Sequence, residues 1–95
     1  MKLRRIQFRL HAIRRMFERE ISDQEVLKVI REGEVIEEYP NDEPYPSMLI
    51  LGFVNDRPIH VVLAVNEEES TGIVVTAYQP DPSLWRDNFR RRRKP

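Results

Sequence analysis

Residues 22–39, SDQEVLKVIREGEVIEEY, contain the point at which the chain changes from a helical to a strand pattern. Ser22 can cap the N-terminus of a helix, and Glu25 three residues later completes a capping box. An apolar stripe at helical spacing follows: Val26, Leu27, Val29 and Ile30. Gly33 is well placed to end this helix. Polar and apolar residues then alternate over residues 34–39, so the stretch predicts a helix followed directly by a short strand.

A second amphipathic segment, FRLHAIRRMFER at residues 8–19, precedes this stretch. Its apolar residues have the spacing of one helical face: Leu10, Ile13, Met16 and Phe17. We expect this stripe to pack in the core of the protein. A tight turn at Glu20–Ile21 is expected to join the two short helices.

Three segments after residue 39 are predicted to be strands: SMLILGFV, RPIHVVLAV and GIVVTAYQP. A turn at Asn55–Asp56 separates the first two, and the polar turn NEEEST separates the last two. Connections this short make neighbouring strands antiparallel. The predicted fold is therefore α+β, with two N-terminal helices packed on one face of a roughly four-stranded antiparallel sheet.

The segment after the last strand predicts a short C-terminal helix or a tail. Pro80 and Pro82 prevent the strand from continuing. Trp85 and Phe89 are four residues apart, so a short helix could pin both side chains to the body of the protein. Residues 90–95 then form a basic tail.

The whole chain, residues 1–95, is expected to form one domain, because 95 residues with 40% hydrophobic content suffice for one core. The absence of cysteine excludes a disulfide framework and a thiolate metal site. Two histidines without ligand spacing give no support for a metal site, and we expect no cofactor. Neither a signal peptide nor a membrane span is visible, so we expect a cytoplasmic protein.

The net charge of zero conceals a partition along the chain. Residues 1–20 carry seven basic and two acidic groups, net +5. Residues 21–85 carry three basic and thirteen acidic groups, net −10, and the last ten residues carry six basic and one acidic group, net +5. If the two cationic ends meet on one face, they would form a patch that binds a polyanion such as RNA. The alternative is a solvated tail, or one that docks on the acidic body.

His60 is one candidate for acid–base chemistry. It lies in the middle of a predicted strand, three residues after Arg57. Thr76 and Tyr78 share one face of the adjacent strand, so one of them is expected to face His60. A histidine with an arginine and a hydroxyl group nearby could abstract a proton from a ribose 2′-OH and stabilise the charge of the phosphorane. The alternative is a half-buried histidine that is hydrogen-bonded within the sheet.

His11 is the other candidate. His11, Arg14 and Arg15 are spaced i, i+3 and i+4, so the three side chains project together from the first helix. This face could contact phosphate, with His11 as an acid or base. The alternative is an ordinary solvated helix face.

The proline-rich segment YPNDEPYPS at residues 39–47 is stiff, because each proline fixes its own φ and restricts the residue before it. It is either a rigid corner between two strands or a wall of a cleft near His60. In the second case, Asp42, Tyr45 and Ser47 would form that wall. The full set of expected substrate contacts is Arg14, Arg19, Asp42, Tyr45, Ser47, Arg91 and Arg92.

Five segments together resemble the bacterial family known as domain of unknown function 4258. They are, in order, LHAIRRMFEREIS, EVLKVIREGEVIEEYPNDEPYPS, LILG, RPIHVV and YQPDPSLW. The resemblance runs from about Phe8 to Arg93. Two positions depart from the family pattern: Glu20 stands where members usually carry glycine, and Met48 where many carry cysteine.

This resemblance implies a relation to the toxins of type II toxin–antitoxin systems, in the RelE- and BrnT-like group of compact α+β ribonucleases. We therefore expect a metal-independent endoribonuclease that acts on RNA, with an antitoxin of zinc-finger type as its partner. His60 or His11 would be the general base or acid. Arg57 and Arg15 would stabilise charge, and Tyr78 would position the substrate. The alternative is a non-enzymatic module that binds a protein or a nucleic acid.

Overall fold

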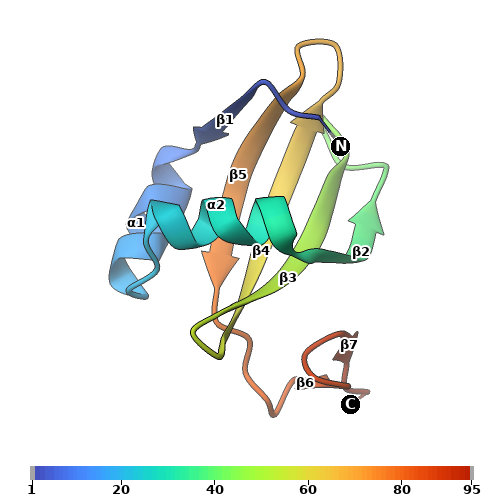
Figure 1. Ribbon diagram of the computed structural model, residues 1–95. Helices are drawn as coiled ribbons and strands as arrows, with labels where there is room; N and C mark the ends of the chain where they lie inside the picture. Colours follow the sequence, from blue (N-terminus) through green and yellow to red (C-terminus); the bar gives the residue numbers. More distant parts are fainter. Residues whose placement is uncertain (1, 95) are drawn as a thin grey trace.

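The computed structural model describes residues 2–94, which form two helices and seven strands (Figure 1). The helices are α1 (Leu10–Glu18) and α2 (Asp23–Glu32). The strands are β1 (Arg5–Phe8), β2 (Glu34–Tyr39), β3 (Ser47–Val54), β4 (Arg57–Asn66), β5 (Thr71–Tyr78), β6 (Trp85–Arg86) and β7 (Arg91–Arg92). Both helices cover the same face of the main sheet, and the β6–β7 unit lies near the end where β3 turns into β4.

The main sheet is mixed and has five strands in the order β1-β5-β4-β3-β2. Strands β2 to β5 are antiparallel to their neighbours, but β1 runs parallel to β5 at the edge, with Arg5 opposite Thr71 and Phe8 opposite Val74. The prediction of a four-stranded antiparallel sheet was therefore wrong. Strand β1 was missed because it is short, half of its residues are polar, and its partner lies near the other end of the chain. Phe8, which was assigned to the first helix, is the last residue of β1.

The C-terminal segment forms a pair of short strands instead of a helix. Trp85 lies opposite Arg92 in an antiparallel pair. The turn between the strands has three successive residues with positive φ: Asp87, Asn88 and Phe89. Left-handed residues cannot continue a right-handed helix, so the predicted short helix was wrong. The expected basic tail of residues 90–95 includes β7, and its last residue lies outside the described part of the chain.

The boundaries of α2 agree with the sequence prediction. The Ser22 hydroxyl accepts a hydrogen bond from the Glu25 backbone at 3.1 Å, and the Glu25 carboxylate accepts one from the Ser22 backbone at 2.8 Å. This is the predicted capping box. Gly33 caps the C-terminus, and a Cβ there would lie 2.6 Å from the Leu51 carbonyl oxygen. The close approach of β3 therefore leaves no room for another residue at this position.

The main core lies between the helices and the sheet. Its buried members are Ala12, Met16, Ile21, Val26, Val29, Ile50, Ile59, Val61, Leu63, Val65, Val74 and Ala77. Residues of β4 alternate as expected, so Ile59, Val61 and Leu63 face the helices and His60 faces the other way. Neither helix within residues 2–94 has the length and apolar character needed to cross a membrane.

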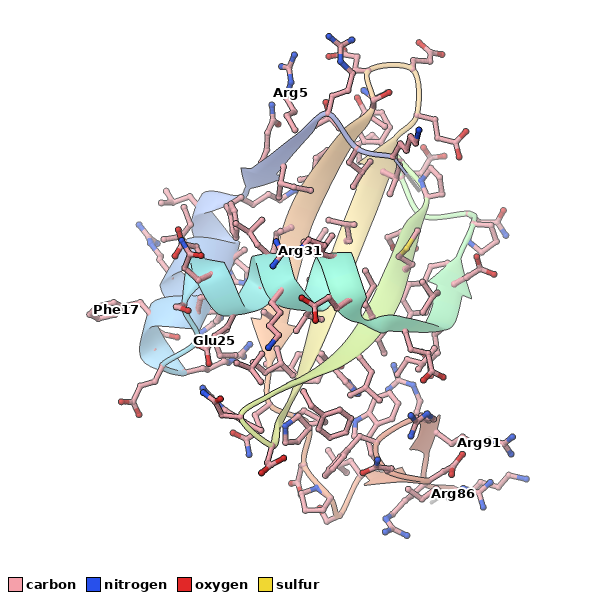
Figure 2. All side chains as sticks on the ribbon, in the orientation of Figure 1. Arg5, Phe17, Glu25, Arg31, Arg86 and Arg91 are labelled. Carbon is pink, nitrogen blue, oxygen red and sulfur yellow. The ribbon has the colours of Figure 1, made fainter. Side chains whose placement is uncertain are left out.

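The apolar stripe predicted on the first helix is only partly in this core. Met16 is buried, together with Ala12. In contrast, the side chains of Leu10, Ile13 and Phe17 are 65%, 49% and 86% exposed. Phe17 points away from the body of the protein in Figure 2. The expectation that the whole stripe packs in the core was therefore wrong for three of its four residues.

Candidate functional site

The sheet face opposite the helices carries buried polar groups beneath the C-terminal segment. His60 on β4 lies in register between Leu51 on β3 and Tyr78 on β5. The Trp85 ring covers His60, with its centroid 4.5 Å from the imidazole centroid and the two planes nearly perpendicular. As a result, the His60 side chain is 0% exposed. The prediction that a hydroxyl residue of the adjacent strand faces His60 is confirmed for Tyr78.

Both ring nitrogens of His60 have hydrogen-bond partners. Nε2 lies 2.9 Å from the Phe89 carbonyl oxygen, which can only accept, so Nε2 carries the hydrogen. Nδ1 lies 3.2 Å from the Tyr78 hydroxyl, which donates to it. Burial lowers the pKa of His60, and the hydrogen bond to Phe89 offsets this effect only in part. The imidazole is therefore neutral at neutral pH.

Arg92 links the C-terminal segment to β2. Its Nε and Nη2 atoms donate to the Glu37 carboxylate at 3.1 and 3.2 Å. Its guanidinium carbon lies 4.7 Å from the centroid of the Trp85 ring, a cation–π arrangement. The Tyr39 hydroxyl donates to the same carboxylate. Arg92 is thus held by a carboxylate on one side and an aromatic ring on the other.

The charge states in this region follow from burial and hydrogen bonding. Burial alone would raise the pKa of Glu37, but hydrogen bonds from Tyr39 and Arg92 outweigh it, so the pKa of Glu37 lies below its ordinary value. Burial raises the pKa of Tyr78 and of Tyr39, and the neighbouring Glu37 raises that of Tyr39 further. At neutral pH the region therefore holds a carboxylate, a guanidinium and two protonated phenols.

We call this group the sheet-face cluster, defined as Glu37, Tyr39, His60, Tyr78 and Arg92. It combines a neutral imidazole, whose Nδ1 can accept a proton, with a fixed positive charge and hydroxyl donors. These are the groups needed for proton transfer and for stabilising negative charge on a phosphate in a transition state. Across residues 2–94, no three histidine, cysteine, aspartate or glutamate side chains are grouped as they would be around a metal ion.

Arg57, which was expected to act beside His60, is directed elsewhere. Its Nη1 and Nη2 atoms donate to the carbonyl oxygens of Glu20 and Arg19, both at 2.8 Å. Its Nε donates to the Gln79 side chain at 2.9 Å. Arg57 therefore holds the turn between the helices against the end of β5.

The candidates on α1 lie on the helix side of the sheet. His11 and Arg14 are exposed, and Arg15 forms an ion pair with Glu18 at 3.0 Å. The guanidinium of Arg19 donates to the Ala77 carbonyl oxygen at 2.9 Å and to the Thr76 hydroxyl at 3.4 Å. Because the sheet separates α1 from His60, the structure does not bring His11, Arg14 or Arg15 to the sheet-face cluster.

The proline-rich loop lies at the far end of β4 from His60. Its Asp42 carboxylate accepts a hydrogen bond from the Ser47 hydroxyl at 2.5 Å. Ser47 lies opposite Ala64, four residues along β4 from His60, or about 13 Å at the usual strand rise. Tyr45 lines a surface hollow with the acidic β4–β5 turn. The structure therefore does not place Asp42, Tyr45 and Ser47 beside His60, and the loop is a corner between β2 and β3.

The cationic ends of the chain do not meet on one face. Arg5 lies on β1 and the residues that receive the C-terminal arginines lie on β2, at opposite edges of the sheet. Arg90 pairs with Glu34 at 3.0 Å and Arg92 with Glu37 at 3.1 Å. Among the described residues 2–94, Arg91 pairs only with Asp87, at 3.6 Å, and it points outward in Figure 2. The arrangement matches the alternative in which the tail docks on the acidic body.

Sequence reasoning assigned no role in this region to Glu37, Tyr39 or Trp85, apart from anchoring by Trp85. Glu37 and Tyr39 are two apart on a predicted strand, so the alternation already placed them on one face. That signal did not connect them to His60, because the contact depends on how the C-terminal segment docks on β2. Trp85 was expected only to anchor the segment, but it also covers the imidazole.

Comparison with known proteins gives one result. The family model described as "Domain of unknown function (DUF4258)" matches residues 8–79, well over half of the chain, so the chain belongs to this family. No curated protein and no solved structure matches the chain.

Proposed function

We propose that this member of the DUF4258 family is the toxin of a bacterial toxin–antitoxin pair and cleaves RNA in the cytoplasm without a metal ion. The observation that carries the proposal is the sheet-face cluster, in which a neutral histidine, a carboxylate, a guanidinium and two phenols meet on one face. The relation to RelE- and BrnT-like ribonuclease toxins that the family resemblance implies leads to the same function. It also supports an antitoxin, of zinc-finger type, as the partner.

In the proposed reaction, His60 Nδ1 accepts the proton of a ribose 2′-OH while the 2′ oxygen attacks the neighbouring phosphorus. Before the segment moves, the Phe89 carbonyl accepts a hydrogen bond from Nε2, which selects the tautomer whose Nδ1 is the acceptor. Arg92 stabilises the negative charge that develops on the phosphorane. Tyr78 donates its proton to the departing 5′ oxygen and recovers one from His60. The products are a 2′,3′-cyclic phosphate and a 5′-hydroxyl end.

This reaction requires the C-terminal segment to shift, because His60 is 0% exposed beneath Trp85. The contacts that hold the segment to β2 include the pairs Arg90–Glu34 and Arg92–Glu37, whose arginines are 36% and 61% exposed. Ion pairs this exposed contribute little to stability. Phosphate groups of RNA compete well for arginine, so Arg92 would exchange the Glu37 carboxylate for the scissile phosphate.

The test is induced expression in bacteria, followed by analysis of cellular RNA, for the wild type and for His60→Gln, Tyr78→Phe and His11→Ala. We expect the wild type and His11→Ala to slow growth and cleave RNA. His60→Gln and Tyr78→Phe should lose the effect by about a hundredfold or more. Tyr78→Phe keeps the packing of the ring, so a loss of activity with an unchanged melting temperature separates chemistry from folding. A wild-type protein that neither slows growth nor cleaves RNA would contradict the proposal.

A second candidate function is a non-enzymatic binding module. It is favoured by the complete burial of His60 with both nitrogens bonded, which is the arrangement of a structural histidine. In that case the sheet-face cluster would only anchor the C-terminal segment. The wild type would then bind its partner without cleaving RNA. His60→Gln would have a different melting temperature from the wild type, and expression of either protein would leave growth unaffected.

A further inference from the structure

The outward side of α1 carries exposed apolar residues that the fold itself does not use. Leu10, Ile13 and Phe17 are spaced i, i+3 and i+7 and therefore lie on one side of the helix. We call them the α1 stripe. Their exposed fractions of 65%, 49% and 86% are large, and Phe17 projects into solvent in Figure 2. The other large exposed hydrophobic residues within residues 2–94 are dispersed over β2, β3 and the C-terminal segment: Val35, Phe53 and Leu84.

A shallow apolar hollow lies beside the α1 stripe. It has a volume of about 330 Å³ and is lined by Phe8, Ile13, Met16, Phe17, Ile21 and Asp23. The inward side of α1 already packs on the sheet through Ala12 and Met16. The side chains of the α1 stripe are therefore not needed to pack the core. Together with the hollow, they form an exposed apolar surface that could receive side chains of another molecule.

The border of the α1 stripe is more basic than acidic. Arg14 is one turn after Leu10, and Arg9 precedes the helix; Arg5 lies further away, at the start of the edge strand β1, and the one acidic residue that lines the hollow is Asp23. Within residues 2–94, none of these three arginines forms an ion pair. Residues 1–20 as a whole carry net +5. A second copy of the chain would bring like charges together at this surface, which disfavours a symmetric dimer here.

We propose that the α1 stripe binds an acidic amphipathic helix of a partner protein. The apolar side of that helix covers Leu10, Ile13 and Phe17 and places a side chain in the hollow, in the helix-in-groove manner. Its carboxylates pair with Arg9 and Arg14 along the border. RNA also suits the arginines, but its phosphate backbone offers no apolar cover for two aliphatic side chains. A protein helix therefore satisfies both features of the surface.

This inference does not depend on the ribonuclease proposal, because the sheet separates the α1 stripe from the sheet-face cluster. It concerns a surface that remains available whether or not His60 is catalytic. The two proposals can therefore fail separately, and the experiment below measures binding alone.

The test is a selection on the full-length protein from a displayed library of amphipathic helices whose polar sides are either acidic or basic. We expect acidic helices to be enriched. For a selected peptide, we expect Ile13→Ala/Phe17→Ala to weaken binding about tenfold or more by fluorescence anisotropy. Arg9→Glu/Arg14→Glu should weaken it similarly. The control Leu84→Ala removes an equally exposed apolar side chain elsewhere and should leave the affinity unchanged.

Three results would overturn the proposal. The first is enrichment of basic helices, or of no helix at all. The second is a selected peptide that binds Ile13→Ala/Phe17→Ala as well as the wild type. The third is self-association or single-stranded RNA binding that is lost in the same variant, which would assign the surface to a second copy or to nucleic acid. Phe17 is 86% exposed, so the variant should keep the wild-type fold, which its melting curve and circular dichroism check.

Discussion

His60 is the residue on which the proposed chemistry depends, and its environment has a consequence for stability. Burial beneath Trp85 disfavours the imidazolium, so the pKa of His60 is lower in the folded protein than its ordinary value of 6.5. The unfolded chain therefore binds more protons than the folded chain once the pH falls below about 6.5. Above that pH, the neutral imidazole makes its full contribution to folding stability. This contribution is lost as the pH falls towards the lower pKa of His60 in the folded protein.

We predict that the wild type loses stability between about pH 7 and pH 5.5, and that His60→Gln shows a smaller loss over this range. The pKa of Glu37 lies below its ordinary value of 4.5, because hydrogen bonds from Tyr39 and Arg92 outweigh its burial, so that carboxylate contributes little in this window. The measurement is the free energy of unfolding by urea at several pH values. Equal pH dependence in the two proteins would mean that His60 does not carry the effect.

Glu20 is a second residue with a testable consequence. Its φ is 56°, in the left-handed region, where a residue with a Cβ is strained and glycine is not. Glycine is also the residue expected at this position from the family pattern. We predict that Glu20→Gly stabilises the protein by about 0.5 to 1 kcal/mol, measured by urea denaturation. Arg14→Gly, in the right-handed interior of α1, is the matched control and should destabilise by about 1 kcal/mol.

At the scale of elements, the C-terminal segment that contains β6 and β7 is attached to the sheet mainly by side chains. Trp85 is buried. Arg92 lies over the Trp85 ring and donates a hydrogen bond to Glu37 on β2. The chain has one tryptophan, so its fluorescence reports directly on this segment. If the segment shifts to admit RNA, the contacts of Arg92 should determine how readily it opens.

We predict that Arg92→Ala loosens the segment, because it removes the cation–π contact with Trp85 and the hydrogen bonds to Glu37, about 1 kcal/mol in all. Acrylamide should then quench Trp85 more efficiently, and its emission should shift to longer wavelength. Arg91→Ala is the matched control, since Arg91 is largely exposed and its ion pair in the described part of the chain is with Asp87 of the same segment. Identical quenching in both variants would show that Arg92 does not hold the segment.

The elements that could be predicted from sequence depend on residues close together in the chain. Ser22 and Glu25 specify the start of α2, and Asn55–Asp56 specifies the β3–β4 turn, where both residues have positive φ. Strand β1 could not be predicted, because its partner β5 is distant in sequence and its four residues carry a weak pattern. The β6–β7 pair was missed for another reason: three successive left-handed residues without glycine have no clear local signal.

In the candidate site, too, contacts between neighbouring elements could be predicted and contacts between distant ones could not. The His60–Tyr78 pair could be predicted, because strand alternation and a short connection place neighbouring residues opposite one another. The contacts of Glu37 and Tyr39 with Arg92 could not, because they require the end of the chain to fold back on β2. For the same reason the arginine beside His60 is Arg92, and Arg57 serves the turn between the helices.

At the scale of the whole molecule, the two faces of the sheet have different features. One face carries the sheet-face cluster beneath the C-terminal segment, and the other carries the helices with the α1 stripe outermost. Arg90 and Arg92 of the cationic C-terminus pair with acids of β2, whereas Arg9 and Arg14 near the N-terminus are exposed beside the α1 stripe. A partner on α1 and RNA on the opposite face could therefore bind together without overlap.

The most direct test of the central proposal is end-group analysis of RNA incubated with the purified protein in the presence of EDTA. We predict that the wild type and Arg91→Ala produce fragments with 2′,3′-cyclic phosphate and 5′-hydroxyl ends. Tyr78→Phe, with an unchanged melting curve, should produce them at least about a hundredfold more slowly. Intact RNA with the wild type, or equal rates for the wild type and Tyr78→Phe, would contradict a catalytic role for the sheet-face cluster.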